Sequence, residues 1–144
     1  GIPVTVFSSP ENLHFIERIA VRHPGLNIAI DHMMRAAGKR DEEAFARLDD
    51  LLALAKHPNI AVKATNMPSR ISGGYPYARV HPFIHRVFDA FGPKRLFWGT
   101  DVTNLACTYR QGVTMFTEEM PWLSSSDLEW IMGRSLCTWL GWNG

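Results

Sequence analysis

The sequence predicts an α/β fold in which parallel strands alternate with helices, amounting to about half of a (β/α)8 barrel. Short apolar runs rich in β-branched residues alternate about four times with stretches of helical periodicity. The helical stretches run to roughly 10 to 15 residues, as in right-handed crossovers between parallel strands. The chain has 144 residues, whereas a complete barrel needs about 250.

A doubly wound open sheet is the competing architecture. Such a sheet, when it binds a dinucleotide, carries a glycine-rich GxGxxG turn after its first strand. The segment Phe7-Ser8-Ser9-Pro10 has no glycine. The sequence therefore disfavours dinucleotide binding and favours the half-barrel.

The first two strands are predicted over residues 2–7 and 27–31, both short and apolar. Between them, Ser8-Ser9-Pro10-Glu11 supplies a helix cap, a proline suited to the first turn and an early acid. We expect the helix to run to Arg22, because His23-Pro24-Gly25 follows.

A second helix is predicted over residues 41–55 and a third strand over residues 60–64. The loop 65–77 that follows is the longest irregular segment and is a candidate binding loop. The apolar stripe of the helix consists of Phe45, Leu48, Leu51, Leu52 and Ala55.

The remaining elements are a helix over residues 78–91, a fourth strand over residues 96–99, and two helices over residues 109–120 and 124–140. Ser124-Ser125-Ser126-Asp127 is a typical cap for the last helix.

Composition narrows the class of protein. The formal net charge is +1, charged residues make up 20% and hydrophobic residues 46%, which disfavours binding to nucleic acid or to an anionic membrane. The cysteines and the lack of a membrane span predict a cytoplasmic protein. No run approaches the roughly 18 apolar residues of a membrane span. Cys107 and Cys137 are expected to be reduced thiols.

Polar residues stand at or near the ends of the last three strands: Asp31-His32, Lys63 and Asp101. If the strands are parallel, these residues converge on one rim, where an imidazole and a carboxylate could bind a metal or activate water. The alternative is that Asp31 and His32 cap the next segment, Lys63 points to solvent and Asp101 is a turn residue.

His81 and His85 form an i, i+4 pair of the kind that can bind zinc. The pair lacks the glutamate of an HExxH motif, and its helix is expected on the outside of the sheet. We interpret these two histidines as packing or surface residues.

Several motifs occur in a set order: Asp31-His32-Met33-Met34-Arg35, Val62-Lys63, Tyr75-Pro76-Tyr77-Ala78, Phe91 to Asp101 and Met132-Gly133-Arg134-Ser135-Leu136. In this order and spacing they resemble the C-terminal half of the amidohydrolase-2 family, barrel hydrolases, lactonases and decarboxylases that are metal-dependent or, in some members, metal-independent. The resemblance implies that residues 1–144 form strands five to eight of such a barrel. The chain opens inside a strand-like run without an initiator Met, so we expect a fragment of a longer enzyme or a chain completed by association.

The resemblance also implies roles for individual residues. His32 would be a metal ligand or substrate contact, and Asp101 a metal ligand and the acceptor of a proton from water. Arg35 could meet a substrate carboxylate, because a guanidinium suits bidentate contact. Lys63 and Tyr75 are further expected substrate-binding residues.

Three departures from the family pattern bear on the metal. Met34 replaces a usual glycine, Phe7-Ser8 stands where metal-binding members have a histidine, and the first-strand His-x-His has no counterpart. A catalytic zinc needs about three protein ligands, and His32 and Asp101 are two. We therefore expect a divalent metal, zinc first, or no metal in the complete enzyme, and a chain that is inactive alone.

The leading functional hypothesis is hydrolysis of a small carboxylated or lactone substrate by water that Asp101 activates. Decarboxylation on the same scaffold is the second hypothesis. The third is a catalytically silent half-barrel that functions only by association, since half a barrel leaves strand edges exposed for self-association.

Overall fold

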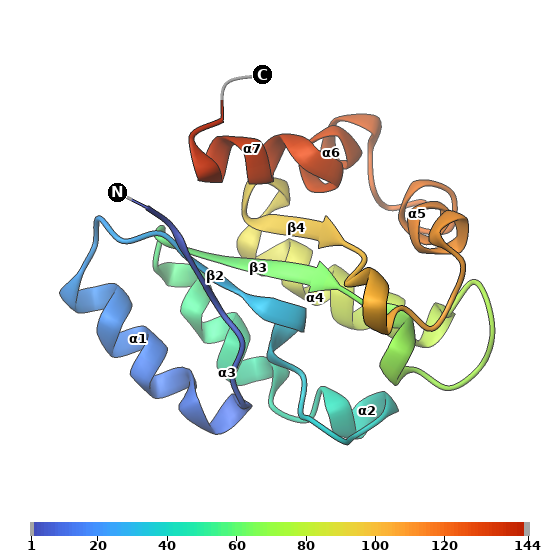
Figure 1. The fold of residues 1–144 in the computed structure, drawn as a ribbon, viewed down its shortest axis with the longest axis horizontal. Helices are drawn as coiled ribbons and strands as arrows, with labels where there is room; N and C mark the ends of the chain where they lie inside the picture. The colour runs from blue at the N-terminus through green and yellow to red at the C-terminus, as the bar shows by residue number, and fades with distance from the viewer. Residues whose placement is uncertain (1, 143–144) are drawn as a thin grey trace.

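A computed structural model describes residues 2–142 of the chain. Its centre is a four-stranded parallel sheet in the order β1-β2-β3-β4. The strands are β1 (Val4–Val6), β2 (Ile28–Ile30), β3 (Ile60–Thr65) and β4 (Leu96–Gly99). The arrowheads of β3 and β4 point the same way in Figure 1. Sequential order and a helical crossover between each pair of successive strands confirm the predicted half-barrel topology.

The α-helices are α1 (Leu13–Arg22), α2 (Asp41–Ala44), α3 (Leu48–Leu52), α4 (His81–Phe91), α5 (Tyr109–Thr117), α6 (Ser125–Glu129) and α7 (Ser135–Leu140). Short 3-10 turns join several of them. The turns η1 (Pro10–Asn12) and η5 (Ala78–Val80) lead into α1 and α4, so the predicted helix starts there are 3-10 in form.

The predicted helix over residues 41–55 is broken into α2, α3 and the turn η3 (Ala53–Lys56). The backbone N–H of Ala36 donates to the carbonyl of Ala44, which removes the acceptor that a continuous helix would use at Leu48. Phe45 at the break stacks on Phe83 of α4, with ring centroids 4.4 Å apart. Tertiary packing thus overrides the local helical periodicity.

The predicted helix over residues 124–140 is also interrupted. The segment Trp130–Arg134 (η8) forms a π-helical turn between α6 and α7. The Ser124 cap is present as predicted, since its hydroxyl accepts from the N–H of Asp127 while the Asp127 side chain accepts from Ser124.

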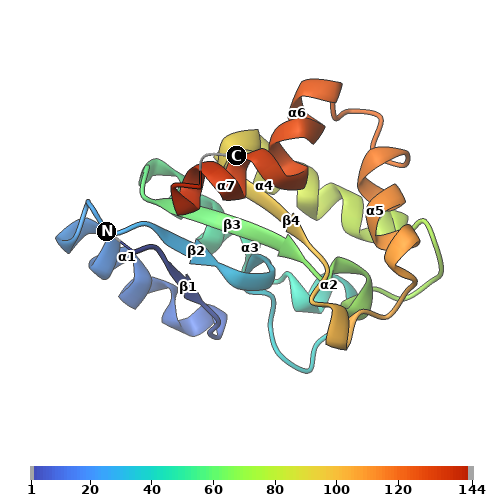
Figure 2. The same cartoon turned by 45° about the horizontal axis from the view of Figure 1, so that its top comes forward.

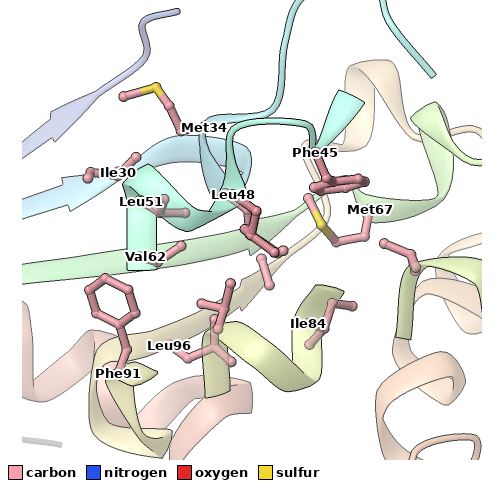
Figure 3. Packing of buried hydrophobic residues seen from close by; sticks show 14 of the residues in the cluster. Ile30, Met34, Phe45, Leu48, Leu51, Val62, Met67, Ile84, Phe91 and Leu96 are labelled. Carbon is pink, nitrogen blue, oxygen red and sulfur yellow. The ribbon is translucent and has the colours of Figure 1, made fainter. Parts of the chain in front are cut away.

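One face of the sheet packs on α1, α3 and α4 and forms the main core. Figure 3 shows Leu48 and Leu51 of α3 directed toward Val62 of β3, with Leu96 of β4 and Ile84 of α4 beside them. These side chains are all nearly fully buried. Burial of this apolar area is the main force that holds the helices on the sheet.

The opposite face carries Ala29, Ala61 and Phe97, on which Leu136 and Trp139 of α7 pack. Figure 2 shows α7 lying across the sheet from α1 and α3. Side chains alternate between faces along a strand.

The alternation puts Lys63 and Thr65 on the face of Ala61, beyond the part that α7 covers. The carboxyl end of this face is where the polar residues gather.

Gly1, the first residue of the predicted domain, and residues 143–144 lie outside the part of the chain described. Within residues 2–142, β1 and β4 each have one strand neighbour. Cys107 and Cys137 are free thiols. No helix in this range has the length and apolar character needed to cross a bilayer.

Candidate active site

Three polar residues that follow β2, β3 and β4 adopt left-handed backbone conformations. The φ angles are 53° for His32, 55° for Asn66 and 50° for Asp101. This region is costly for residues other than glycine and concentrates at functional sites. The left-handed turns stop each strand abruptly and bring the three residues together at one rim.

Asp101 is held by two amides. Asn66 Nδ2 donates to its Oδ2 at 2.9 Å, and Asn104 Nδ2 donates to its Oδ1 at 3.1 Å. Partial burial acts to raise the pKa of Asp101, but these hydrogen bonds, with the charge of Arg35, lower it below its usual value. The carboxylate is therefore ionised and fixed in orientation at neutral pH.

Ser69 sets the direction of the Asn66 amide. Its hydroxyl donates to Asn66 Oδ1 and also lies 2.8 Å from the backbone carbonyl of Asn104. Because the amide oxygen is engaged by Ser69, the amide nitrogen faces Asp101. The loop after β3 and the turn after β4 are thus tied together at the carboxylate.

His32 is oriented by Thr65, the last residue of β3. Its Nδ1 lies 2.6 Å from Thr65 Oγ1 and 3.2 Å from the Thr65 carbonyl. A carbonyl can only accept, so this contact assigns the proton to Nδ1 and leaves the Nε2 lone pair free. Burial, with the nearby charge of Arg35, lowers the pKa of His32, so the ring is neutral at neutral pH.

His32 Nε2 and Asp101 Oδ2 lie 3.8 Å apart, too far for a direct hydrogen bond. The ring of Phe7, which follows β1, meets the His32 ring edge-on with centroids 5.5 Å apart. The imidazole nitrogen and the carboxylate therefore face the same space without being bonded to each other.

That space is a cavity of about 530 Å³. A second cavity of about 200 Å³ is lined by four of the same residues, Phe7, His32, Arg35 and Arg70. The residues that line the larger, first cavity are Phe7, His32, Arg35, Asn66, Ser69, Arg70, Asp101, Asn104 and Ala106.

Arg35 lies between the two cavities, and its Nη1 donates to the Thr65 carbonyl at 3.3 Å. Burial and the neighbouring charge of Arg70 lower the pKa of Arg35 to about 10. The guanidinium is still charged at neutral pH. Its charge faces the cavity that holds His32 and Asp101.

The structure thus brings together three of the five predicted site residues: His32, Arg35 and Asp101. Lys63 lies outside the cavity lining and forms an ion pair with Asp31 at 2.6 Å, so it does not point freely to solvent. The side chain of Asp31 caps nothing in the turn that follows β2.

Tyr75 also lies outside the cavity lining. Its hydroxyl lies 2.9 Å from Thr114 Oγ1 and 3.0 Å from Glu119 Oε1, and its single proton can be donated to one of them. In this arrangement it connects the loop after β3 to α5.

The two histidines of α4, His81 and His85, contact residues outside the cavity. His81 Nε2 lies 3.0 Å from the Pro76 carbonyl, and His85 stacks on Trp122 with centroids 4.2 Å apart. Both contacts agree with packing roles for the two rings.

Five residues of the site escaped the sequence reasoning: Thr65, Asn66, Ser69, Arg70 and Asn104. The first four lie in the predicted binding loop 65–77. The length of that loop was the one sequence signal that could have pointed to them. Asn66 and Asn104 are ordinary turn residues by type. Their contact with Asp101 becomes visible only when two strand ends are placed side by side.

The donor set does not fit a zinc ion. Within residues 2–142, no group of three or more His, Cys, Asp or Glu side chains could hold a metal. His32 and Asp101 are two donors, both oxygens of Asp101 accept amide hydrogens, and Arg35 adds positive charge. Because zinc takes three or four protein ligands, these residues alone do not make a catalytic zinc site.

The chain matches the sequence profile of the amidohydrolase family (Amidohydro_2) over residues 1–134. The chain belongs to the amidohydrolase family. The family resemblance predicted from the ordered motifs is thereby confirmed.

Among curated proteins, the chain resembles an L-fucono-1,5-lactonase of Burkholderia ambifaria, with 33% identity over 95 residues. The match covers 65% of this chain and 32% of the lactonase.

Solved amidohydrolases show the same fold. One from Burkholderia multivorans, with bound zinc, gives a TM-score of 0.81 at 21% identity and covers 96% of this chain and 52% of its own. A Pseudomonas putida protein assigned as a 2-pyrone-4,6-dicarboxylic acid hydrolase gives 0.71 at 19% identity, covering 99% and 52%. This amidohydrolase chain therefore spans about half the length of these structures.

Proposed function

We propose that the complete protein hydrolyses a small lactone, with Asp101 as the general base. The observation that carries the proposal is the carboxylate held ionised by Asn66 and Asn104 in a cavity that it shares with the unprotonated Nε2 of His32. A general base needs this combination of fixed position, ionised state and access to substrate.

In the proposed reaction, Asp101 takes a proton from a water molecule as the water oxygen bonds to the lactone carbonyl carbon. The ring carbon–oxygen bond then breaks, and the leaving oxygen receives the proton from Asp101. The product is a hydroxy acid, and Asp101 returns to its carboxylate form. The Nε2 lone pair of His32, 3.8 Å from Asp101 Oδ2, helps to orient the attacking water.

The relatives support this reaction class and leave the substrate open. One is named for a lactone of a sugar acid and another for a pyrone, which is also a cyclic ester. Lys63 and Tyr75 remain predicted substrate contacts. To reach a substrate in the cavity, Lys63 would have to leave Asp31, and Tyr75 would have to leave Thr114 and Glu119.

A zinc-bound relative is known. In the complete protein a zinc site would need a further ligand from outside the described residues. The proposed step is therefore derived from Asp101, which the described residues contain.

The test is to incubate the full-length protein with a panel of sugar lactones and carboxylated pyrones in water labelled with oxygen-18. The proposal expects ring opening with one labelled oxygen in the new carboxylate. Release of carbon dioxide without label uptake would contradict it and establish the decarboxylase alternative.

A further inference from the structure

The second cavity lies between the loops that follow β2 and β3. Ala36 and Ala37 of the first loop and Arg70 of the second line it, and residues 7–9 after β1 are also in the lining. Its volume is about 200 Å³, below the roughly 300 Å³ at which ligand pockets in proteins usually begin. The spacing between the two loops therefore limits the size of a chemical group that fits there.

The loop after β3 is the fixed side of this cavity. Met67, Pro68 and Ile71 are buried, and the Ile71 N–H donates to the Pro68 carbonyl at 3.4 Å. Ser69 and Arg70, which lie between these buried residues, line the first cavity. Because the core holds the chain on both sides of them, the position of Arg70 is set by packing.

The loop after β2 is more exposed. Its residues 37–40 are all exposed to solvent, and the loop is closed at its base, where the Ala36 N–H donates to the Ala44 carbonyl at 2.8 Å. Asp41, the first residue of α2, has a left-handed backbone with a φ of 51°, which is costly for a residue other than glycine. Exposed loops with few buried contacts open easily, so a tie at Asp41 would restrain this one.

The side chain of Asp41 reaches the loop after β3. Its Oδ1 accepts from the Ser72 N–H at 2.7 Å and from the Ser72 hydroxyl at 2.9 Å. The bond from the Ser72 N–H is the largest influence that holds the pKa of Asp41 below its usual value, so the carboxylate is ionised at neutral pH. Figures 1 and 2 both show α2 beside the segment that follows β3. We call these two hydrogen bonds the Asp41–Ser72 clamp.

Arg79 supports the clamp from outside. Its Nη1 donates to the Ser72 hydroxyl oxygen at 3.0 Å, and its Nη2 donates to both carboxylate oxygens of Glu42 at 2.9 Å. Ser72 lies two residues after Arg70, and Asp41 lies four residues after Ala37. The clamp thus joins the two loops close to the residues with which they line the second cavity.

We propose that the Asp41–Ser72 clamp determines substrate size: it holds Ala36 and Ala37 at a fixed distance from Arg70 and so limits the ring substituent that the second cavity accepts. Asp41 is a positioning residue, because it lies outside the lining of both cavities. The inference rests on the proposed function and adds a selection for small ring substituents to it.

Three variants of the full-length protein separate the clamp from its surroundings. Asp41→Gly removes the carboxylate and adopts the left-handed backbone without cost. Asp41→Asn tolerates the same backbone and keeps an oxygen that accepts from the Ser72 N–H. Glu42→Ala is the matched control, since it removes the neighbouring exposed carboxylate that pairs with Arg79. Circular dichroism checks that each variant is folded.

The kinetic test uses two six-membered lactones that differ only in a methyl or a butyl group on the carbon next to the ring oxygen. In the parent protein, kcat/KM for the methyl lactone should exceed that for the butyl lactone by about tenfold or more. Asp41→Gly should lower this ratio by about threefold or more, whereas Asp41→Asn and Glu42→Ala should keep it. An unchanged ratio in Asp41→Gly would overturn the inference.

Hydrogen exchange measured by mass spectrometry tests the clamp without turnover. Backbone amides of residues 36–44 should exchange about tenfold faster in Asp41→Gly, because local opening of an exposed loop then costs less free energy. Asp41→Asn and Glu42→Ala should exchange at the parent rate. Parent-like exchange in Asp41→Gly would show that the clamp does not hold the loop and would overturn the inference.

Calorimetric titration with the two corresponding lactams separates this inference from the proposed function. If the protein opens neither lactone, but binds the methyl lactam more tightly and loses this preference in Asp41→Gly, the inference is supported and the proposed function is overturned. Equal kcat/KM values for the two lactones in the parent protein would overturn the inference and leave lactone hydrolysis standing.

Discussion

Thr65 connects the backbone of β3 to the chemistry of the site. Its hydroxyl and carbonyl both contact His32 Nδ1, and Gly99 on β4 leaves the room for its methyl group. A Cβ on Gly99 would lie 2.6 Å from Thr65 Cγ2, closer than packed carbon atoms approach. The glycine of the Trp98-Gly99-Thr100-Asp101 motif therefore has a packing reason that acts through Thr65 on His32.

Replacing Thr65 by Val keeps the shape and the carbonyl but removes the hydroxyl that lies 2.6 Å from Nδ1. We expect kcat/KM for lactone hydrolysis to fall about 10- to 100-fold, because a displaced side chain in the site costs rate. Thr117→Val on α5 is the matched control, since the Thr117 hydroxyl donates to the Val113 carbonyl of its own helix. Equal kcat/KM values for the two variants would show that the hydroxyl does not position His32.

Residue types at strand ends allowed His32 and Asp101 to be predicted, because a polar residue after an apolar strand is visible in the sequence, whereas Arg35 was predicted only from the family resemblance. Asn66 could not be predicted as a partner of Asp101. The two residues are 35 positions apart, and their contact depends on the pairing of β3 with β4. Whether Lys63 and Tyr75 reach substrate stays a prediction.

At the scale of elements, Asn59 joins α1 to the sheet. Its buried amide nitrogen lies 3.1, 3.3 and 3.0 Å from the carbonyls of Ala20, His23 and Leu26, at the end of α1 and the start of the next strand. The Ala20 carbonyl lies in the last turn of α1, where no intrahelical N–H reaches it, and the Asn59 side chain supplies a donor there. The turn His57-Pro58-Asn59 therefore anchors α1 to the sheet.

Replacing Asn59 by Ala should lower the free energy of unfolding by about 2 kcal/mol, because buried carbonyls lose their donor. Urea unfolding of the full-length protein measures this change. Asn27→Ala removes an amide that forms no side-chain hydrogen bond within residues 2–142, so it should change stability by less than about 0.5 kcal/mol. If Asn27→Ala lowered the free energy of unfolding as much as Asn59→Ala does, the anchoring role of Asn59 would be contradicted.

Helical periodicity predicted where helices occur but not where they break. The stripe Phe45 to Ala55 has the spacing of one helix, and the break at Phe45 arises from its stacking on Phe83 and from the Ala36 hydrogen bond. Phe83 is distant from Phe45 in the sequence, and Ala36 lies in a loop, so neither contact is visible in the helical periodicity. The strands, in contrast, were predicted to within a few residues because each is bounded by turn residues.

At the scale of the molecule, apolar side chains are exposed at one edge. Ile2 (86% exposed) and Phe7 (75%) flank β1, and Phe15 and Val21 are exposed on α1. Single exposed apolar residues are ordinary, but a group beside an unpaired parallel strand is a site for association. We propose that residues 1–144, produced alone, self-associate through this edge.

Sedimentation velocity of residues 1–144 should show concentration-dependent oligomers at tens of micromolar, a typical range for association of exposed edges. Val4→Lys places a charge on the edge strand and should shift the distribution toward monomer. Ser126→Lys, at an exposed residue of α6, is the control that adds the same charge away from β1 and α1. A stable monomer of the unmodified chain would contradict the proposal.

The central claim is that Asp101 is the general base of a lactone hydrolase, and the most direct test is the turnover number of Asp101→Asn in the full-length protein. The amide keeps the shape and removes the proton acceptor, so kcat should fall by a factor of about a hundred or more. Asp89→Asn, at an exposed carboxylate of α4, should retain the parent kcat. A near-normal kcat for Asp101→Asn would contradict the claim.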